Sequence, residues 1–292
     1  MDGRRRRRAG AALTTSRQQV RAAAKRQRAQ RRTTISALST LVVLGGLAAI
    51  LVTSPGWHEV RTTYFAWDDL KDSFPDVLKG FWLDVKLFVI VEACVLVLGL
   101  VVALVRTTRA PAFFPLRLLA AVFCDVARGV PVVLLVYLVG FGVPALDLKG
   151  LPTDALVLGG MALTFSYSGY VAEVYRSGID AVHPSQMAGA LALGLTRGQA
   201  LRHVIVPQAV RRVVPPLLND FIALQKDVAL VSFLGPMEAF RVAQIDAASN
   251  FVYTPLVAAA VLYLFVTIPM ARVVDHLQAK SRRVRGVVEV AA

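Results

Sequence analysis

The sequence predicts an all-α membrane protein with about six transmembrane helices. Hydrophobic residues make up 56% of the 292 positions, a share that is unusual for a water-soluble domain of this size. Six apolar stretches are each about long enough to cross a hydrocarbon core of ~30 Å. Basic residues also alternate between loops that contain many and loops that contain few. The predicted spans are residues 35–53, 81–105, 118–142, 154–175, 213–234 and 255–274.

The distribution of basic residues predicts the orientation of the chain. Residues 1–34 contain twelve Lys or Arg, including a run from Arg4 to Arg8. An alternation of sides from this end puts four segments on the same side of the membrane, and together they hold 25 of the 33 basic residues. These segments are 1–34, 106–117, 176–212 and the tail from Arg272. The positive-inside rule therefore predicts that both termini are cytoplasmic. Nucleic-acid binding by the Arg run is an alternative, but a topology anchor with affinity for anionic lipid headgroups fits the alternation better.

The first apolar stretch, residues 35–53, is predicted to be a retained signal-anchor helix. A long basic region precedes it, and no small-x-small cleavage site precedes Pro55. Residues 54–80 then interleave aromatic and Asp side chains, as in an amphipathic segment at the outer interface. Cys94 and Cys124 fall inside apolar stretches, so a disulfide is not expected.

The loop at residues 184–207 contains an unusual density of helix-capping signals. Ser185, beside a proline, is placed to cap a first short helix. Gly194 can end that helix, because glycine readily takes the left-handed conformation needed there. Thr196 and Gln199 have the spacing of a capping box that would open a second helix.

Pro207 is expected to limit the second helix of this loop. Small side chains between the two ends would let another protein approach the backbone closely, and they are Ala188, Gly189, Ala190 and Ala192. The alternative is an ordinary surface hairpin without a partner. The loop lies on the predicted cytoplasmic side, so its partner would be a cytoplasmic protein.

The loop resembles the cytoplasmic EAA coupling loop of type I ABC importer permeases, in the polar amino-acid subgroup. Matching residues within the loop are Gln186, Ala190, Ala192, Leu193, Gly194, Thr196, Gln199, Val204 and Pro207. The match continues at Gln208, Ala209, Arg211, Pro215, Pro216, Leu217, Asn219, Phe221, Ile222, Leu224, Lys226, Asp227, Leu230 and Ser232. Upstream, residues 128–131 and 170–179 resemble two further motifs of the family, and the resemblance covers roughly residues 80–275.

Two motifs depart from the family pattern. The signature Glu-Ala-Ala is Ala188-Gly189-Ala190 here, so the glutamate is absent and the strength of the ATPase contact is in question. Val228 and Ala229 replace a Thr-Ser pair, which removes two hydroxyl groups and puts the usual polar substrate in question.

The resemblance implies the permease subunit of an ATP-driven amino-acid importer in the bacterial cell membrane. Its five-helix core would be residues 81–276, with the 35–53 helix added and with cytoplasmic tails at 1–34 and 277–292. Implied partners are an ABC ATPase dimer, a second identical or homologous permease chain, an extracytoplasmic substrate-binding protein and the lipid bilayer, but no nucleic acid. The implied ATPase contacts are Ser185, Gln186, Ala188, Gly189, Ala190, Gly194, Leu195, Thr196, Gln199 and Arg202.

Charged residues inside the predicted spans are candidates for a translocation path, because a charge in lipid costs several kcal/mol unless it is paired or hydrated. Asn219, Lys226 and Asp227 share one helix stripe and could face the same cavity. A buried Lys226–Asp227 ion pair that pins two helices together is the alternative. The candidate residues of the path and its gate are Asn219, Lys226, Asp227, Arg128, Glu173, Ser166 and Tyr170.

Helical spacing predicts two further pairs, Asp125 with Arg128 and Glu173 with Arg176, as helix-locking or gate pairs. Near the outer end of the second span, Asp84 is expected to reach toward the interface beside a lysine.

Catalytic signals are missing from the sequence. It contains no phosphate-binding loop, no nucleophile elbow and no Cys or His cluster with metal-ligand spacing. The chain is therefore expected to be a transport subunit rather than an enzyme, with no cofactor of its own and with ATP and magnesium on the partner ATPase. Two other function classes stay open: an ATP-independent secondary transporter or channel, and a non-transporting membrane scaffold.

Overall fold

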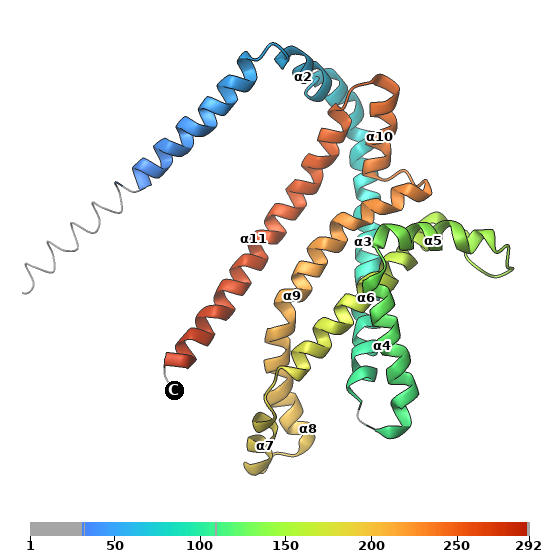
Figure 1. Cartoon of the computed structure of the whole chain (residues 1–292), viewed down its shortest axis with the longest axis vertical. Helices are drawn as coiled ribbons and strands as arrows, with labels where there is room; N and C mark the ends of the chain where they lie inside the picture. The colour runs from blue at the N-terminus through green and yellow to red at the C-terminus, as the bar shows by residue number, and fades with distance from the viewer. Residues whose placement is uncertain (1–30, 32, 109, 291–292) are drawn as a thin grey trace, which may run out of the picture. The chain divides into compact units, whose positions relative to one another are not determined.

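The computed structural model describes residues 31, 33–108 and 110–290, with side chains described as far as residue 279. It divides into two compact units, Met1–Thr62 and Thr63–Ala292. Every element assigned in the described part is helical, which confirms the predicted all-α class (Figure 1). The predicted basic tail lies almost entirely outside the described residues.

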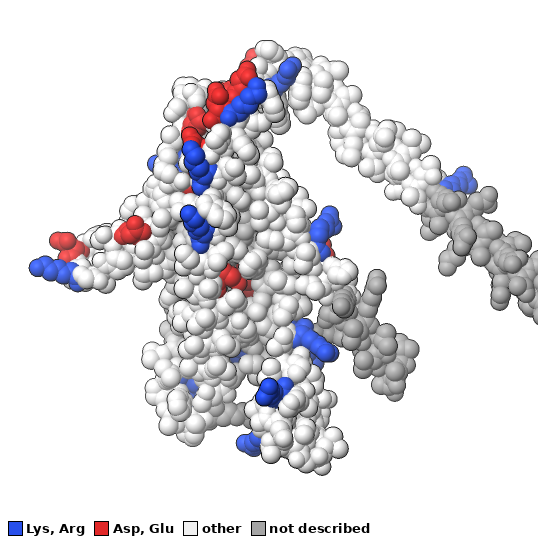
Figure 2. Space-filling model, turned by 180° about the vertical axis from the view of Figure 1, so that it is seen from behind, with Lys and Arg blue, Asp and Glu red and all other residues white. Residues whose placement is uncertain are grey.

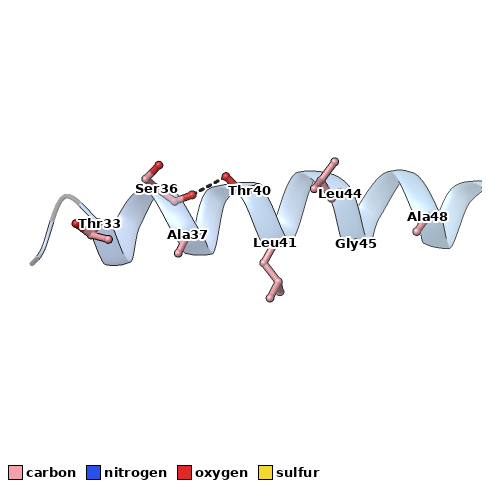
Figure 3. Close-up of a pocket in the computed structure, with 8 residues that line it drawn as sticks. All are labelled: Thr33, Ser36, Ala37, Thr40, Leu41, Leu44, Gly45 and Ala48. Atoms are coloured by element: carbon pink, nitrogen blue, oxygen red, sulfur yellow. Dashed lines mark hydrogen bonds between the residues drawn. The ribbon is translucent and has the colours of Figure 1, made fainter. Parts of the chain in front are cut away.

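The first unit contains the predicted added helix, which runs from Thr33 to Thr53. Its 21 residues have a mean hydropathy of 2.4 and none of its apolar window is buried within the structure. At 1.5 Å per residue the helix is about 31 Å long, enough to cross a bilayer core. Figure 3 shows one face of this helix, where small side chains alternate with leucines and Thr40 donates a hydrogen bond to the Ser36 carbonyl oxygen (2.8 Å).

After a bend, the short helix α2 (Trp57–Tyr64) leads to the main body of the protein. The helices of the main body, in chain order, are α3 (Trp67–Thr107), η1 (Pro111–Phe113), α4 (Phe114–Gly129), α5 (Val132–Ala145), α6 (Ala155–Asp180), α7 (Pro184–Ala192), α8 (Arg197–Ala200), η2 (Leu201–Ile205), α9 (Val206–Asp227), η3 (Val228–Leu234), α10 (Ala239–Asn250) and α11 (Thr254–Val290).

Helix α3 merges two segments that the sequence separates. Most of the predicted interfacial segment 54–80 and the span that follows it form one helix of 41 residues. The first turns of α3 carry acidic and basic side chains, whereas its later turns are almost entirely apolar. Figure 2 shows charged side chains gathered at the end where α3 begins, with few across the long central face. A similar merging occurs at the other terminus, where the predicted tail from residue 277 continues α11 as far as Val290.

Four described helices are long and apolar enough to cross a membrane, and there are six spans if each of two bent helix pairs counts as one. The predicted span 118–142 is not one straight helix, because α4 and α5 meet at an angle of 105°. Val130, which precedes Pro131, has an extended backbone (φ −93°, ψ 130°). A residue before proline is sterically disfavoured in the helical region, so the break follows from local sequence.

The predicted span 213–234 is also not one regular helix. The α-helical part ends at Asp227, and the chain continues as the 3₁₀ helix η3. Gly235, with φ 109°, then ends η3 in the left-handed region that glycine tolerates. Helix α10 follows at an angle of 53° to the preceding segment.

Helix α6 lies at the centre of the main body and packs against α3, α4, α5, α9 and η3 (Figure 1). Small residues on α6, such as Gly169 and Gly178, allow these close contacts. A Cβ atom added at Gly169 would lie 2.6 Å from the Ala127 Cβ of α4, and one at Gly178 would lie 2.1 Å from a Val213 methyl of α9. The largest buried hydrophobic cluster surrounds α6 and contains Phe88, Val91, Val95, Leu135, Val136, Ala162, Leu163, Tyr167, Val171, Leu224, Val228 and Val231.

A second hydrophobic cluster joins α3, α10 and α11 through Val77, Phe81, Ala239, Ala243 and Ala259. Gly80 lies at the closest approach of α3 to the start of α10. A Cβ atom added there would be 2.6 Å from the Glu238 carbonyl carbon and 2.7 Å from the Ala239 backbone nitrogen.

Gly80→Ala is expected to destabilise the protein, because the new methyl group would meet backbone atoms that cannot rotate away. Overpacking of this kind costs about 1–3 kcal/mol. The control is Gly142→Ala in α5, where no atom lies within 4 Å of the added Cβ and helix propensity alone predicts neutrality or a small gain. Unfolding of the two purified variants in the same detergent measures their difference in stability. Equal stability would show that α3 and α10 can move apart at this contact without cost.

Candidate functional site

The candidate docking site is the hairpin formed by α7 and α8, which connects α6 to α9. His183, rather than Ser185, caps the start of α7, because its ring Nδ1 accepts a hydrogen bond from the Ser185 backbone N–H (3.2 Å). The prediction that Ser185 is the cap is therefore wrong by two residues. Pro184 explains the shift, since the residue before a proline is held extended and so becomes the N-cap.

The turn between α7 and α8 has the predicted form. Gly194 takes φ 86°, and its N–H donates to the Leu191 carbonyl oxygen (3.0 Å). The Leu195 N–H donates to the Ala190 carbonyl oxygen (3.2 Å), which completes a Schellman motif. These bonds satisfy the carbonyl groups that a helix end leaves without partners.

The predicted capping box at the start of α8 is confirmed. The Thr196 hydroxyl oxygen accepts from the Gln199 backbone N–H (3.3 Å), and the Gln199 Oε1 accepts from the Thr196 N–H (2.9 Å). The two helix ends that flank the turn are therefore both closed by local hydrogen bonds, so the hairpin has a defined shape.

The prediction that Pro207 ends the second helix is wrong. The chain passes from α8 through a π-helical turn, Leu201–Ile205, directly into α9. Pro207 lies in the first turn of α9, where its missing N–H costs little. The hairpin is thus joined to α9 by continuous helix, with one wide turn between them.

Most of the predicted docking residues are exposed on this hairpin, and these are Ser185, Gln186, Ala188, Gly189, Gly194, Thr196, Gln199 and Arg202. Leu195 is half-buried. Ala190 is an exception, since it is only 5% exposed and its small side chain packs inside the hairpin rather than presenting a surface. Gln186 also has an internal partner, because its Oε1 accepts a hydrogen bond from the Gln208 Nε2 of α9 (3.1 Å).

Leu193 is a surface residue that the sequence-based site leaves out. It is 86% exposed at the tip of the hairpin, immediately before the turn glycine. The position of this leucine at the Schellman turn directs its side chain outward. From the sequence alone, an apolar residue next to Ala192 fits a buried helix face equally well. The hairpin therefore presents small side chains and one exposed leucine.

A group of ion pairs lies where α3, α4 and α6 approach one another. Glu173 Oε2 accepts from Arg106 Nη1 (2.7 Å), and the same carboxylate pairs with Arg176 one turn further along α6. Arg128 of α4 lies 3.9 Å from Glu173. The predicted Glu173–Arg176 pair is confirmed. Arg106 was not expected, because it is 67 residues distant in sequence.

The predicted Asp125–Arg128 pair is wrong. Asp125 is exposed and forms no ion pair with a described residue, whereas the Arg128 guanidinium lies 5.8 Å from the Tyr170 ring centre. The Tyr170 hydroxyl in turn donates to the Arg128 carbonyl oxygen (3.3 Å). Arg128 and Tyr170 therefore do lie together, as two of the predicted gate residues.

The polar residues of α9 separate into two groups. Asp227 Oδ2 accepts a hydrogen bond from the Tyr167 hydroxyl of α6 (2.8 Å). Lys226 and Asn219 are exposed, and Lys226 has no ion pair among the described residues. The alternative of a buried Lys226–Asp227 ion pair is therefore not what the structure contains. Tyr167 is a partner that the sequence-based site leaves out.

Two other predicted or charged positions have different surroundings from those expected. Ser166 is fully buried and donates to the Ala127 carbonyl oxygen (3.2 Å), so it joins α6 to α4 rather than facing a path. Glu92 of α3, for which the sequence offers no partner, is half-buried. One Asp220 oxygen is buried without a hydrogen-bond partner among the described residues.

No group of three or more His, Cys, Asp or Glu side chains that could hold a metal occurs in the described part of the chain. Cys94 is exposed and Cys124 is buried, and both are free thiols.

The fold and the site together define a multi-span membrane protein of the transport-subunit class, with a structured hairpin between α6 and α9. The chain belongs to the family of binding-protein-dependent transport system inner membrane components, whose model matches residues 95–283. It is 33% identical to the probable glutamine ABC transporter permease protein GlnM of Bacillus subtilis, over 73% of this chain and 97% of that protein. It is 30% identical to the glutamine transport system permease protein GlnP of Escherichia coli, over 75% of this chain and 98% of that protein.

Solved structures agree with the family. A crystal structure of an amino acid ABC transporter with histidines matches with a TM-score of 0.62 and 31% identity, covering 72% of this chain and 94% of that one. An inward-facing structure of the MetNI methionine ABC transporter matches with a TM-score of 0.53 at 19% identity, a likeness that concerns the fold.

Arg106 and Glu173 can be replaced by Gln singly and together in a double-mutant cycle. The expected interaction free energy between them is about 1–3 kcal/mol, because the pair is largely shielded from water. The control is the matching cycle on Asp76 and Lys79, an exposed pair on α3 that should couple by less than ~1 kcal/mol. Equal coupling energies in the two cycles, measured by unfolding in detergent, would contradict a locking role for Glu173.

Proposed function

We propose that the chain is the membrane-spanning permease subunit of an ATP-driven amino-acid importer. The observation that carries the proposal is the α7–α8 hairpin, a capped and exposed element joined directly to two membrane helices. Relatives named as glutamine and arginine transport permeases support amino acids as the substrate class. The family description supports a separate binding protein that delivers the substrate.

The hairpin is proposed to dock on a partner ATPase. Its exposed small residues Ala188 and Gly189 permit close approach of another backbone, and Leu193 offers an apolar side chain that a groove could accept. The family's glutamate is absent at position 188, so shape and apolar contact replace a charged contact. The ATPase dimer would bind ATP and magnesium, and this chain would hold no cofactor.

Movement of the docked hairpin would be passed to the membrane helices through hydrogen bonds. Gln186 of α7 is bonded to Gln208 of α9, and the Arg212 guanidinium donates to the Ala181 carbonyl oxygen at the end of α6. Both contacts tie the hairpin's two ends to each other. A shift of the hairpin would therefore move α6 and α9 together.

The translocation path is proposed to run along α6 and α9. Lys226 and Asn219 are exposed on this chain and would face a cavity shared with a second permease chain. Asp227 with Tyr167, and Arg128 with Tyr170, would line it. Glu173 would hold the cytoplasmic end closed through its arginine partners.

With the orientation that the basic residues favour, the hairpin and both termini would lie in the cytoplasm. The outer side would then be the end where α3 begins, where a binding protein would dock. The proposed organisation keeps 81–276 as the permease domain, 35–53 as an added helix, and residues 1–34 as a topology anchor that attracts anionic lipids.

Leu193→Ser and Gly189→Trp are expected to reduce transport-stimulated ATP hydrolysis of the reconstituted complex by about tenfold or more, a loss of at least ~1.4 kcal/mol of coupling. The first removes an apolar contact, and the second holds the partner away. The control is Leu148→Ser, which changes a leucine that is 60% exposed in the loop between α5 and α6. Stimulated hydrolysis at the normal rate by both hairpin variants would remove the hairpin from the docking site.

Lys226→Met is expected to reduce substrate uptake sharply at unchanged membrane abundance, because an exposed mid-span ammonium needs a hydrated or charged partner outside the chain. Tyr167→Phe should weaken uptake less, since it removes one hydrogen bond to Asp227. Lys79→Met is the control, because that exposed lysine of α3 pairs with Asp76 (2.7 Å) outside the predicted span 81–105. Normal uptake by Lys226→Met would exclude Lys226 from the path.

A further inference from the structure

Two carboxyl groups are buried together where α3, α10 and α11 meet. Asp84 of α3 is 3% exposed and Glu238, the N-cap of α10, is 2% exposed. The prediction that Asp84 reaches toward the interface is therefore wrong. Tight packing explains its burial, because Phe81 and Val77 on the same face of α3 press against α10 and α11.

Hydrogen-bond donors reach three of the four carboxyl oxygens. The two Glu238 oxygens accept from the backbone N–H groups of Phe240 (2.8 Å) and Arg241 (2.6 Å). Asp84 Oδ2 accepts from the Tyr263 hydroxyl of α11 (2.8 Å) and from the Ala239 N–H (3.4 Å). Each of the three helices thus contributes to one polar cluster.

The fourth oxygen, Asp84 Oδ1, is buried and has no hydrogen-bond partner among the described atoms. A buried acceptor without a donor is costly, by about 1–3 kcal/mol and more if it is charged. The two carboxyl groups lie at the same helix start, because Asp84 Oδ2 accepts from the N–H of Ala239, the residue that follows Glu238, and Glu238 caps that first turn. The missing donor can therefore be supplied by the neighbouring carboxyl group if that group carries a proton.

No cation among the described residues neutralises the cluster. Neither Asp84 nor Glu238 forms a salt bridge with a described residue. The Nη1 of Arg241 donates to Gln244 (3.0 Å), and its Nε is buried without a hydrogen-bond partner among the described atoms, so this guanidinium donates to neither carboxyl group. Lys86 lies beside Trp82. Helix η3, which also packs here, contains no ionisable side chain. Two adjacent negative charges without a cation would be strongly disfavoured in a dry site.

We propose that Asp84 and Glu238 bind one proton between them and that this proton-bound pair fastens the start of α10 to α3 and α11. The site's ligand is the proton itself, held between a carboxylic acid and a carboxylate. Loss of the proton places two repelling charges at the contact where Gly80 of α3 meets the α10 backbone. The pair therefore holds α10 against α3 and α11 in a pH-dependent way. This role does not rest on the proposed transport function.

The expected direction with pH follows from proton linkage. In the unfolded chain both carboxyl groups lose their protons near pH 4, whereas the folded pair keeps one proton at neutral pH. The folded state therefore binds more protons than the unfolded state in this range. The stability of the protein falls as pH rises from about 4 until the pair is deprotonated.

Asp84→Asn is the most direct test, because the introduced amide would place an N–H donor at the position of Oδ1 and would keep an oxygen for Tyr263. Infrared difference spectra of the full-length protein in lipid are expected to show a protonated-carboxyl band at neutral pH that Asp84→Asn removes. The control is Asp76→Asn, an exposed position on the same helix, which should keep the band. Identical bands in the wild type and Asp84→Asn would overturn the proposal.

Thermal unfolding across pH gives a second readout. Between about pH 5 and 9 the wild-type midpoint should fall relative to that of Asp84→Asn by roughly 3 °C or more. If Asp84→Asn does not fold, Tyr263→Phe serves instead: it removes a bond that favours the ionised form, so the band should persist to higher pH. A second outcome would also overturn the proposal: stability that depends on sodium at fixed pH, together with no infrared band of a protonated carboxyl group. That result would mean that a cation rather than a proton occupies the site.

Discussion

The packing of α6 is the constraint on which the rest of the structure depends. Lipid supplies no hydrophobic drive between helices, so they associate through close packing and a few interhelical hydrogen bonds. Gly169 and Gly178 bring the α6 backbone against α4 and α9, and the Ser166 hydroxyl bonds to the α4 backbone at the same crossing. The bent pair α4–α5 and the 3₁₀ helix η3 then pack against α6, and η3 has its Val228, Val231 and Ser232 side chains buried.

The same helix connects the two functional regions. Its middle carries Tyr167 and Tyr170, which meet Asp227 and Arg128 inside the membrane portion, and its end carries Glu173 within the arginine cluster. Beyond that end, the turn capped by His183 leads into the α7–α8 hairpin, the proposed docking site. The hairpin continues as helix directly into α9, so few irregular turns separate it from the membrane helices. The π-helical turn at Leu201–Ile205 is the main irregularity on the α9 side.

Features that depend on neighbouring residues could be predicted from the sequence. Gly194 and the Thr196–Gln199 capping box are local hydrogen-bond patterns, so their spacing is sufficient. The break before Pro131 is equally local, although the bend of 105° depends on how α5 packs. The overall class follows from hydropathy, because lipid requires every spanning backbone to satisfy its own hydrogen bonds.

Features that depend on distant residues could not be predicted. Arg106 reaches Glu173 across 67 positions, and Asp84 meets Tyr263 across 179. The exposure of a side chain also depends on what packs over it. Ala190 and Leu193 lie close together in one hairpin, yet the first is buried and the second is almost fully exposed. One sequence without the fold cannot distinguish these cases.

The central claim is that the α7–α8 hairpin is the surface through which a separate ATPase drives this permease. Photo-cross-linking from position 189 in a transport-competent complex tests it most directly, with position 148 as the matched site in the α5–α6 loop. The account predicts an adduct with the ATPase from position 189 and none from position 148. A complex that transports substrate but gives no ATPase adduct from position 189 would contradict it.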